Sequence, residues 1–138
     1  DLFVTVFYAV LDPETGVLAY CNAGHNPPLL LPANGDPMQK LPLTALPLGL
    51  LEDEAWEQET MQIRPGDVLI LYTDGLTEAE DELEDYFGES RLATVAQANL
   101  DRPVEVIENK IITAVYDFMD EAAQRDDITL MVVVRNAG

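Results

Sequence analysis

The sequence is built from short apolar segments, rich in β-branched and aromatic residues and separated by turn-forming Pro, Gly, Asn and Asp. Segments of this length and composition favour β-strands. The segments expected to form strands cover residues 2–11, 17–22, 29–31, 38–41, 56–63, 68–72 and 128–134. Because residues 2–11 and 68–72 are almost entirely apolar, we expect both strands to be buried on both faces, and we expect 128–134 to be a buried strand as well.

The apolar spacing changes to a helical period between residues 90 and 123. A helix is predicted within residues 90–99, where apolar residues recur three and four positions apart. A second helix is predicted over residues 103–123, where the apolar residues form one stripe and Pro103 suits the first turn. Since strands precede these helices and a last strand follows them, we predict an α+β fold with a mostly antiparallel sheet and helices on one face.

The chain is strongly acidic, with 26 Asp and Glu against 7 Lys and Arg and a net charge of -19. This balance excludes generic nucleic-acid binding and attraction to anionic membranes, because both require a basic surface. No run approaches the ~18 apolar residues of a membrane-spanning helix. The single cysteine, Cys21, excludes an internal disulfide framework and fits a reducing compartment, so we expect a cytoplasmic protein.

Two acidic sites flank the predicted buried strands. Asp74 follows the strand at 68–72, with Gly75 beside it to permit a sharp turn, and Asp126 and Asp127 precede the strand at 128–134. If these strands are antiparallel neighbours, the carboxylates converge at one edge of the sheet. Converging carboxylates repel each other unless they are protonated or bridged by a cation, and oxygen ligands favour Mg²⁺, Mn²⁺ or Ca²⁺ over Zn²⁺. The alternative is that Asp74 belongs to an ordinary turn and Asp126 to an ordinary linker.

His25 is the only histidine, and it lies in the Gly- and Pro-rich segment NAGHNPP. Because neither a cysteine nor a second histidine is nearby, the residues argue against zinc and favour a structural role for His25. The acidic run at residues 78–89 is expected to be solvated and mobile, the alternative being a flap beside the metal site. The sequence contains no Gly-rich phosphate loop, nucleophile elbow or EF-hand loop.

Four segments occur together in an order that resembles a known family. They are FVTVFYAVLDPETGVLAYCNAGHNPPLL, GDVLILYTDGLTEAED, YFGESRL and DDITLMVVV. The chain resembles, over nearly its whole length, the SpoIIE/RsbU-type bacterial branch of the metal-dependent (PPM, type 2C) serine/threonine protein phosphatases. The combination of NAGHNPPLL, YTDGLTEA and DDITL is far more specific than any of these motifs alone.

The resemblance implies a mostly antiparallel β-sandwich flanked by helices, with a dinuclear Mg²⁺ or Mn²⁺ centre that activates water to attack phosphoserine or phosphothreonine. By motif, Asp74 is a metal ligand, and so is Asp126, with Asp127 as the neighbour that could take this role instead. Gly75 provides close backbone approach, and His25 has a structural or site-supporting role. No catalytic residue is implied beyond the metal-activated water, because two cations neutralise the phosphate and lower the pKa of water.

The family domain begins upstream of residue 1, with the strand and helix that carry the first metal-ligating aspartate. We therefore expect residues 1–138 to be a single, N-terminally incomplete phosphatase domain that binds the two metal ions weakly or not at all and is weak or inactive alone. In the family, an upstream sensor or receiver domain controls the phosphatase, and the substrate is a phosphorylated signalling protein, expected here to be an anti-sigma-factor antagonist. The alternative is a non-catalytic pseudophosphatase that binds a partner in sigma-factor regulation and stress response.

Loss of the upstream elements also has a consequence for assembly. It is expected to uncover apolar residues such as Phe3, Val6 and Tyr8 and to leave strand edges unpaired. Open edges and apolar patches drive self-association. We therefore expect a homodimer, or a strand-exchanged pair, that covers the strand at residues 2–11.

Overall fold

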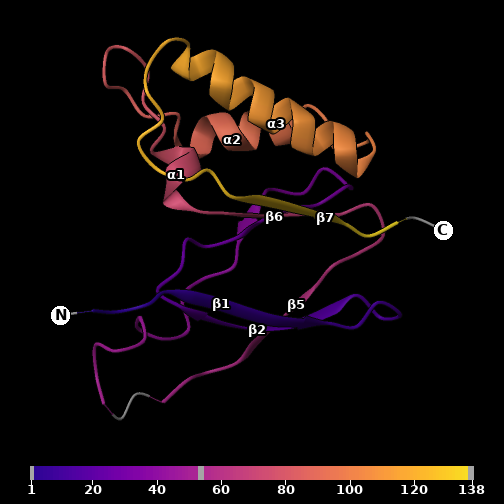
Figure 1. Cartoon of the computed structure of the whole chain (residues 1–138). Coiled ribbons are helices and arrows are strands. Elements are labelled where there is room, and N and C mark those ends of the chain that lie inside the picture. The colour runs from indigo at the N-terminus through magenta and orange to yellow at the C-terminus, as the bar shows by residue number, and fades with distance from the viewer. Residues whose placement is uncertain (1, 53–54, 137–138) are drawn as a thin grey trace.

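The protein is a two-layer β-sandwich with helices packed on one of its outer faces (Figure 1). The computed structural model describes residues 2–52 and 55–136. One sheet has three strands in the order β1-β2-β5, and the other has four in the order β4-β3-β6-β7. The strands are β1 (Val6–Leu11), β2 (Val17–Ala23), β3 (Leu29–Leu31), β4 (Gln39–Lys40), β5 (Glu59–Gln62), β6 (Val68–Tyr72) and β7 (Leu130–Val134). All pairings between these strands are antiparallel.

The helices cover the outer face of the four-stranded sheet (Figure 1). They are α1 (Asp74–Thr77), α2 (Gly88–Gln97) and α3 (Val104–Met119). The apolar stripe predicted for α3 is confirmed, since the residues that it buries recur at a spacing of four, namely Ile107, Ile111, Val115 and Met119. None of the helices in the described ranges has the length and apolar character needed to span a bilayer.

The core has two parts, one on each side of the four-stranded sheet. Side chains of β3, β6, α2 and α3 form the larger cluster beneath the helices. A smaller cluster fills the space between the two sheets, with Leu18 and Tyr20 of β2 against Leu30 of β3 and Leu69 of β6. Strand β6 thus lies between two apolar layers, which confirms the prediction that residues 68–72 are buried on both faces.

Arg135 connects the two sheets at the end of β7. Its guanidinium donates hydrogen bonds to the backbone carbonyls of Ile63 (2.8 Å), Thr15 (3.2 Å) and Glu14 (3.0 Å). Gly16 lies directly against this contact, with its φ at +77°, and a β-carbon there would overlap the Ile63 carbonyl and the guanidinium. The chain turn after β1 and the end of β5 are thereby tied to the four-stranded sheet.

Three predictions about local structure are wrong. Residues 2–11 are not buried on both faces: the strand begins at Val6, and Tyr8 and Val10 are 64% and 58% exposed, because β1 is an edge strand whose outer face is uncovered within the described residues. The strand at 128–134 is half-buried rather than buried, because β7 is an edge strand too. The turn expected at Asp74 is instead the start of the one-turn helix α1.

The exposure expected from the family resemblance is largely present. Phe3 and Tyr8 are exposed, and Val6 is half-buried. The composition of a strand predicts its conformation, but its burial depends on which other elements cover it.

Candidate functional site

The site lies where β6 ends and β7 begins. These strands are antiparallel neighbours, with Tyr72 of β6 opposite Leu130 of β7, and the Thr73 N–H extends the pairing by donating to the Thr129 carbonyl (3.2 Å). The residue after β6 and the segment before β7 therefore lie at the same edge of the sheet. Asp74 and Asp126 accordingly line one cavity of about 210 Å³, as the sequence predicts for their position.

Asp74 is positioned by the abrupt change from strand to helix. It is the first residue of α1, and its carboxylate is exposed. The preceding residue, Thr73, also lines the cavity, and its hydroxyl oxygen is buried without a hydrogen-bond partner in the described part of the chain. The structure thus places a solvent-accessible carboxylate and an unpaired hydroxyl next to each other.

The two adjacent aspartates before β7 occupy different positions. Asp126 lines the cavity, and its Oδ1 accepts a hydrogen bond from the Asp127 N–H (2.8 Å), while its own carbonyl accepts one from the Gln124 side chain (2.9 Å). Asp127 is absent from the cavity wall, and its carbonyl packs against Gly75. The geometry therefore favours Asp126 over Asp127 as the residue that can share a ligand with Asp74.

Gly75 allows the two acidic segments to come this close. A β-carbon at this position would overlap the carbonyl group of Asp127. The backbone of Gly75 has no positive φ, so the requirement for glycine here is steric rather than torsional. Contact between α1 and the segment before β7 therefore depends on the missing side chain.

His25 lies at the same cavity, brought there by the loop after β2. Its N–H donates to the Oδ1 of Asn22 (2.9 Å), which is completely buried, and Gly24 adopts a φ of +75° that lets the chain turn. His25 and Asn26 then line the cavity with the two aspartates. The residue pattern alone favours a structural histidine, whereas the family motif implies a structural or site-supporting one, and His25 lies in the cavity wall. No sequence signal placed Asn26 or Thr5, which also line the wall, beside the carboxylates.

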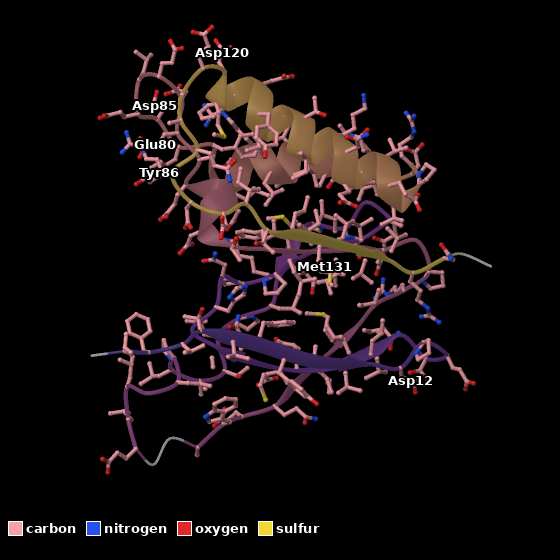
Figure 2. All side chains as sticks on the ribbon, viewed as in Figure 1. Asp12, Glu80, Asp85, Tyr86, Asp120 and Met131 are labelled. Carbon is pink, nitrogen blue, oxygen red and sulfur yellow. The ribbon has the colours of Figure 1, made fainter. Side chains whose placement is uncertain are left out.

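The acidic run at residues 78–89 forms a hydrogen-bonded turn beside the site. Oδ1 of Asp81 accepts hydrogen bonds from the N–H groups of Leu83 and Asp85, at 2.9 Å each. Figure 2 shows Glu80, Asp85 and Tyr86 gathered near α1, at the opposite end of the molecule from Asp12. The side chains of this turn are mostly exposed, as expected for an acidic run.

A second, smaller cavity adjoins the first. It measures about 130 Å³, and its wall includes Glu80, Tyr86, Arg125 and Asp126. Arg125 forms an ion pair with Glu80 (3.6 Å) across this cavity. Because Asp126 lines both cavities, the turn at residues 78–89 lies next to the two-aspartate site.

The hydroxyl of Tyr72 lies within the electrostatic influence of Asp74 and Glu89. Burial raises the pKa of the Tyr72 hydroxyl to about 12, and the negative charges of Glu89 and Asp74 act in the same direction. The hydroxyl donates a hydrogen bond to Glu89 (3.3 Å), which also forms an ion pair with Lys40 (2.7 Å). These contacts join β6, the start of α2 and β4 behind the site.

The oxygen donors of the cavity fit part of a site for a hard cation. Asp74 and Asp126 supply carboxylates, and the unpaired hydroxyl of Thr73 supplies a neutral oxygen. Such donors suit Mg²⁺ and Mn²⁺, which are bound through carboxylates and retained waters. Within residues 2–52 and 55–136, however, no group of three or more His, Cys, Asp or Glu side chains is arranged to hold a metal. The described residues thus bring two carboxylates to one cavity, fewer than a metal-ligating group of three.

Comparisons with known proteins agree on one family. The family of Stage II sporulation protein E (SpoIIE) matches residues 1–136. Protein IcfG of Synechocystis sp. is 34% identical over 135 residues, and the phosphoserine phosphatase RsbU of Bacillus subtilis is 25% identical over the same length; each alignment covers 98% of this chain. The alignments cover 21% of IcfG and 40% of RsbU, so the chain spans less than half the length of either relative.

Solved structures show the same fold. The crystal structure of the RsbU and RsbW domains of Rv1364c from Mycobacterium tuberculosis superposes with a TM-score of 0.76 at 27% identity, over 96% of this chain and 37% of that one. The Mn-presoaked phosphatase domain of SpoIIE from Bacillus subtilis gives a TM-score of 0.68 at 19% identity, over 97% of this chain and 57% of that one. These likenesses confirm the α+β, phosphatase-like sandwich.

Proposed function

This chain belongs to the SpoIIE family, in the SpoIIE/RsbU-type branch of the PPM phosphatases, and we propose that it forms the part of a protein serine/threonine phosphatase domain that supplies two metal-ligating aspartates. One observation carries the proposal: Asp74 and Asp126, which lie more than fifty positions apart in sequence, line one cavity. Each belongs to the motif that carries a metal ligand in the family, YTDG for Asp74 and DDIT for Asp126.

The residues of the cavity have distinct roles in this proposal. Asp74 and Asp126 hold the cations, and Asp127 orients Asp126 through its N–H and packs against Gly75. His25 supports the cavity wall on the side facing the loop after β2. When bound, Mg²⁺ or Mn²⁺ supplies the positive charge that offsets the phosphate dianion and lowers the pKa of water. The remaining ligands come from segments that the longer relatives possess, so the 138 residues form one incomplete domain with weak metal binding.

The substrate in this proposal is a phosphoserine or phosphothreonine of a signalling protein. Supporting it, one relative is named a phosphoserine phosphatase, RsbU, and so is a second, RsbP, which is 25% identical over 131 residues. We propose an anti-sigma-factor antagonist as the phosphorylated protein, a sensor or receiver domain elsewhere in the full-length protein as the regulator, and the cytoplasm as the location. The net charge of -19 agrees with a partner that is neither a nucleic acid nor an anionic membrane.

The proposal is tested by hydrolysis of a phosphoserine peptide with Mn²⁺, using the full-length protein that contains the chain. Asp74→Asn and Asp126→Asn are each expected to reduce kcat/KM by at least about 100-fold, since each removes a charge on which metal affinity depends. Asp101→Asn is the matched control, because Asp101 is an exposed aspartate outside the cavity. Hydrolysis that is independent of metal, or equal activity of the two variants and the control, would refute the proposal.

A non-catalytic role is the second candidate, and the number of carboxylates favours it. Two aspartates line the cavity in the described residues, and no larger metal-ligating group is present there. In this alternative the fold binds a partner in sigma-factor regulation. A full-length protein that binds the phosphorylated antagonist but does not hydrolyse it with either metal would establish the pseudophosphatase.

A further inference from the structure

The hydroxyl of Thr73 is a buried polar group that the fold leaves unpaired. In residues 2–52 and 55–136, its oxygen is the one buried side-chain nitrogen or oxygen atom without a hydrogen-bond partner. The same residue lines the cavity that Asp74 and Asp126 share. An unpaired buried hydroxyl costs stability, and such groups are rare in folded proteins. Its position at the two-aspartate site therefore suggests a role that the folded chain alone does not fulfil.

Thr73 does not use this hydroxyl to cap α1. It precedes the helix with an extended backbone (φ -106°, ψ 166°), the conformation in which a threonine hydroxyl normally accepts a hydrogen bond from the first turn. That side-chain hydrogen bond is not formed in α1. The Leu76 N–H donates to the Thr73 carbonyl instead (3.0 Å). The hydroxyl is thus also unused for the local role that threonine commonly has at this position.

The backbone fixes Thr73 beside the cavity. Its N–H donates to the Thr129 carbonyl (3.2 Å), which continues the pairing of β6 with β7, and α1 begins at the next residue. The side chain can therefore change position only by rotation about its own bonds. Because the described residues already enclose the hydroxyl oxygen, its partner is expected among the protein groups around it rather than in the solvent.

The carboxylate of Asp74 lacks a hydrogen-bond donor in the same way. Oδ1 of Asp126 accepts a hydrogen bond from the Asp127 N–H (2.8 Å), which orients that carboxylate. Within the described residues the carboxylate of Asp74 accepts no hydrogen bond and forms no ion pair. A donor without an acceptor and an acceptor without a donor are thus on adjacent residues of one cavity wall.

Metal binding would change what Asp74 requires. Without metal its carboxylate is exposed, so water satisfies both oxygens. When one oxygen ligates a cation, the other is free to accept a hydrogen bond, and ligating carboxylates normally have such a partner. We propose that Thr73 is a positioning residue of the metal site, whose hydroxyl donates a hydrogen bond to the Asp74 carboxylate when a divalent cation is bound. This inference rests on the proposed metal-binding role of Asp74.

The proposal predicts different effects of one substitution on folding and on metal binding. Valine has the shape of threonine without the hydroxyl, so Thr73→Val removes a polar atom that is unpaired in the metal-free chain. Stability without metal should therefore be retained or increased. Affinity for metal should fall about 10–100-fold, as is typical when a hydrogen-bond partner of a ligand is removed. A purely structural threonine would show the opposite pattern, with stability lost and metal affinity kept.

The test uses the full-length protein that contains the chain, with calorimetric titration of Mn²⁺ into the metal-free protein and thermal denaturation without metal. Thr73→Val is expected to raise the Kd for Mn²⁺ about 10–100-fold and to keep Tm within about 2 °C of the wild type or above it. Thr73→Ser keeps the hydroxyl and should keep a Kd close to that of the wild type. The matched control is Thr129→Val, because Thr129 pairs with Thr73 but is exposed and outside the cavity wall, and both values should be unchanged.

The variants separate this inference from the proposed function. If Asp74→Asn abolishes Mn²⁺ binding but Thr73→Val does not weaken it, the role of Thr73 is refuted and the metal site stands. An equal loss of affinity in Thr73→Val and Thr129→Val, or in Thr73→Val and Thr73→Ser, would also refute the role of the hydroxyl. A metal-free Tm of Thr73→Val that falls by more than about 5 °C would assign the hydroxyl to folding instead. A wild-type protein that binds no Mn²⁺, or binding that is unaffected by Asp74→Asn and Asp126→Asn, would overturn both proposals.

Discussion

Replacement of Gly75 by alanine tests how the two acidic segments are held together. A β-carbon at this position would overlap the Asp127 carbonyl, which is backbone and cannot rotate away. The segment before β7 must therefore move, and overpacking of this kind typically costs about 1–3 kcal/mol. Alanine also regains up to about 1 kcal/mol of helix propensity in α1, which opposes this cost. The balance predicts a destabilisation of roughly 1–2 kcal/mol, and a fall in Tm of about 3–8 °C for a chain of this size.

Thermal and urea denaturation measure the effect of Gly75→Ala. Gly35→Ala is the comparison, since Gly35 has no atom within 4 Å of the added carbon but has a φ of +89°. Its cost is expected to be torsional, about 1 kcal/mol, without any change in the environment of Asp126. Chemical shifts of Asp126 and Asp127 should move in Gly75→Ala alone. A Gly75→Ala protein with unchanged stability and unchanged shifts at both aspartates would refute the steric argument.

Four further outcomes are expected. Arg135→Met should lower the free energy of unfolding, measured in urea, by about 2–4 kcal/mol, because three hydrogen bonds from a charged donor between the sheets are lost. Arg102→Met, at an exposed position, should change the free energy of unfolding by less than about 0.5 kcal/mol. Asp67→Ala should cost about 2–3 kcal/mol in the same assay, because this buried carboxylate accepts two backbone N–H bonds. The pKa of Tyr72 is about 12 in the folded chain and about 10 when unfolded, so its contribution to stability is fully present below pH 10 and should decline as the pH rises toward 12. Tyr72→Phe should remove this decline in thermal melts at alkaline pH. Asp74→Asn should leave Tm without metal unchanged within about 2 °C, since the carboxylate is exposed, and calorimetry of the wild-type chain with Mg²⁺ should detect no tightly bound metal pair.

The features that the sequence predicts correctly are those that depend on residues close together in the chain. The stripe of α3 predicts its buried face, because a helix presents every fourth residue to the same side. The burial of β6 and the position of Asp74 directly after it can likewise be predicted from a short stretch of sequence. That Asp126 meets Asp74 follows from one additional assumption, the antiparallel pairing of β6 with β7, which the structure confirms.

Other features depend on contacts between distant segments, and no local pattern could predict them. The composition of β1 does not reveal that it is an edge strand with an uncovered outer face. The hydrogen bond from the His25 backbone N–H to the buried side chain of Asn22, which holds the loop at the cavity, is also not evident from the sequence, although the family motif implies a structural or site-supporting role for His25. The difference between Asp126 and Asp127 is likewise decided by the contact with Gly75.

The carboxylates of the site have no basic partner in the described residues. Within the described residues the ion pairs join Lys40 to Glu89, Arg64 to Asp36 and Arg125 to Glu80, so no basic side chain neutralises Asp74 or Asp126. Because both carboxylates are exposed, water screens their repulsion and the folded chain tolerates it at little cost. A divalent cation would remove this repulsion, and its binding is therefore expected to add stability in proportion to its concentration over its Kd. The aspartates that we propose as metal ligands, Asp74 and Asp126, are therefore distinct from an aspartate such as Asp67, which is buried and accepts two backbone hydrogen bonds.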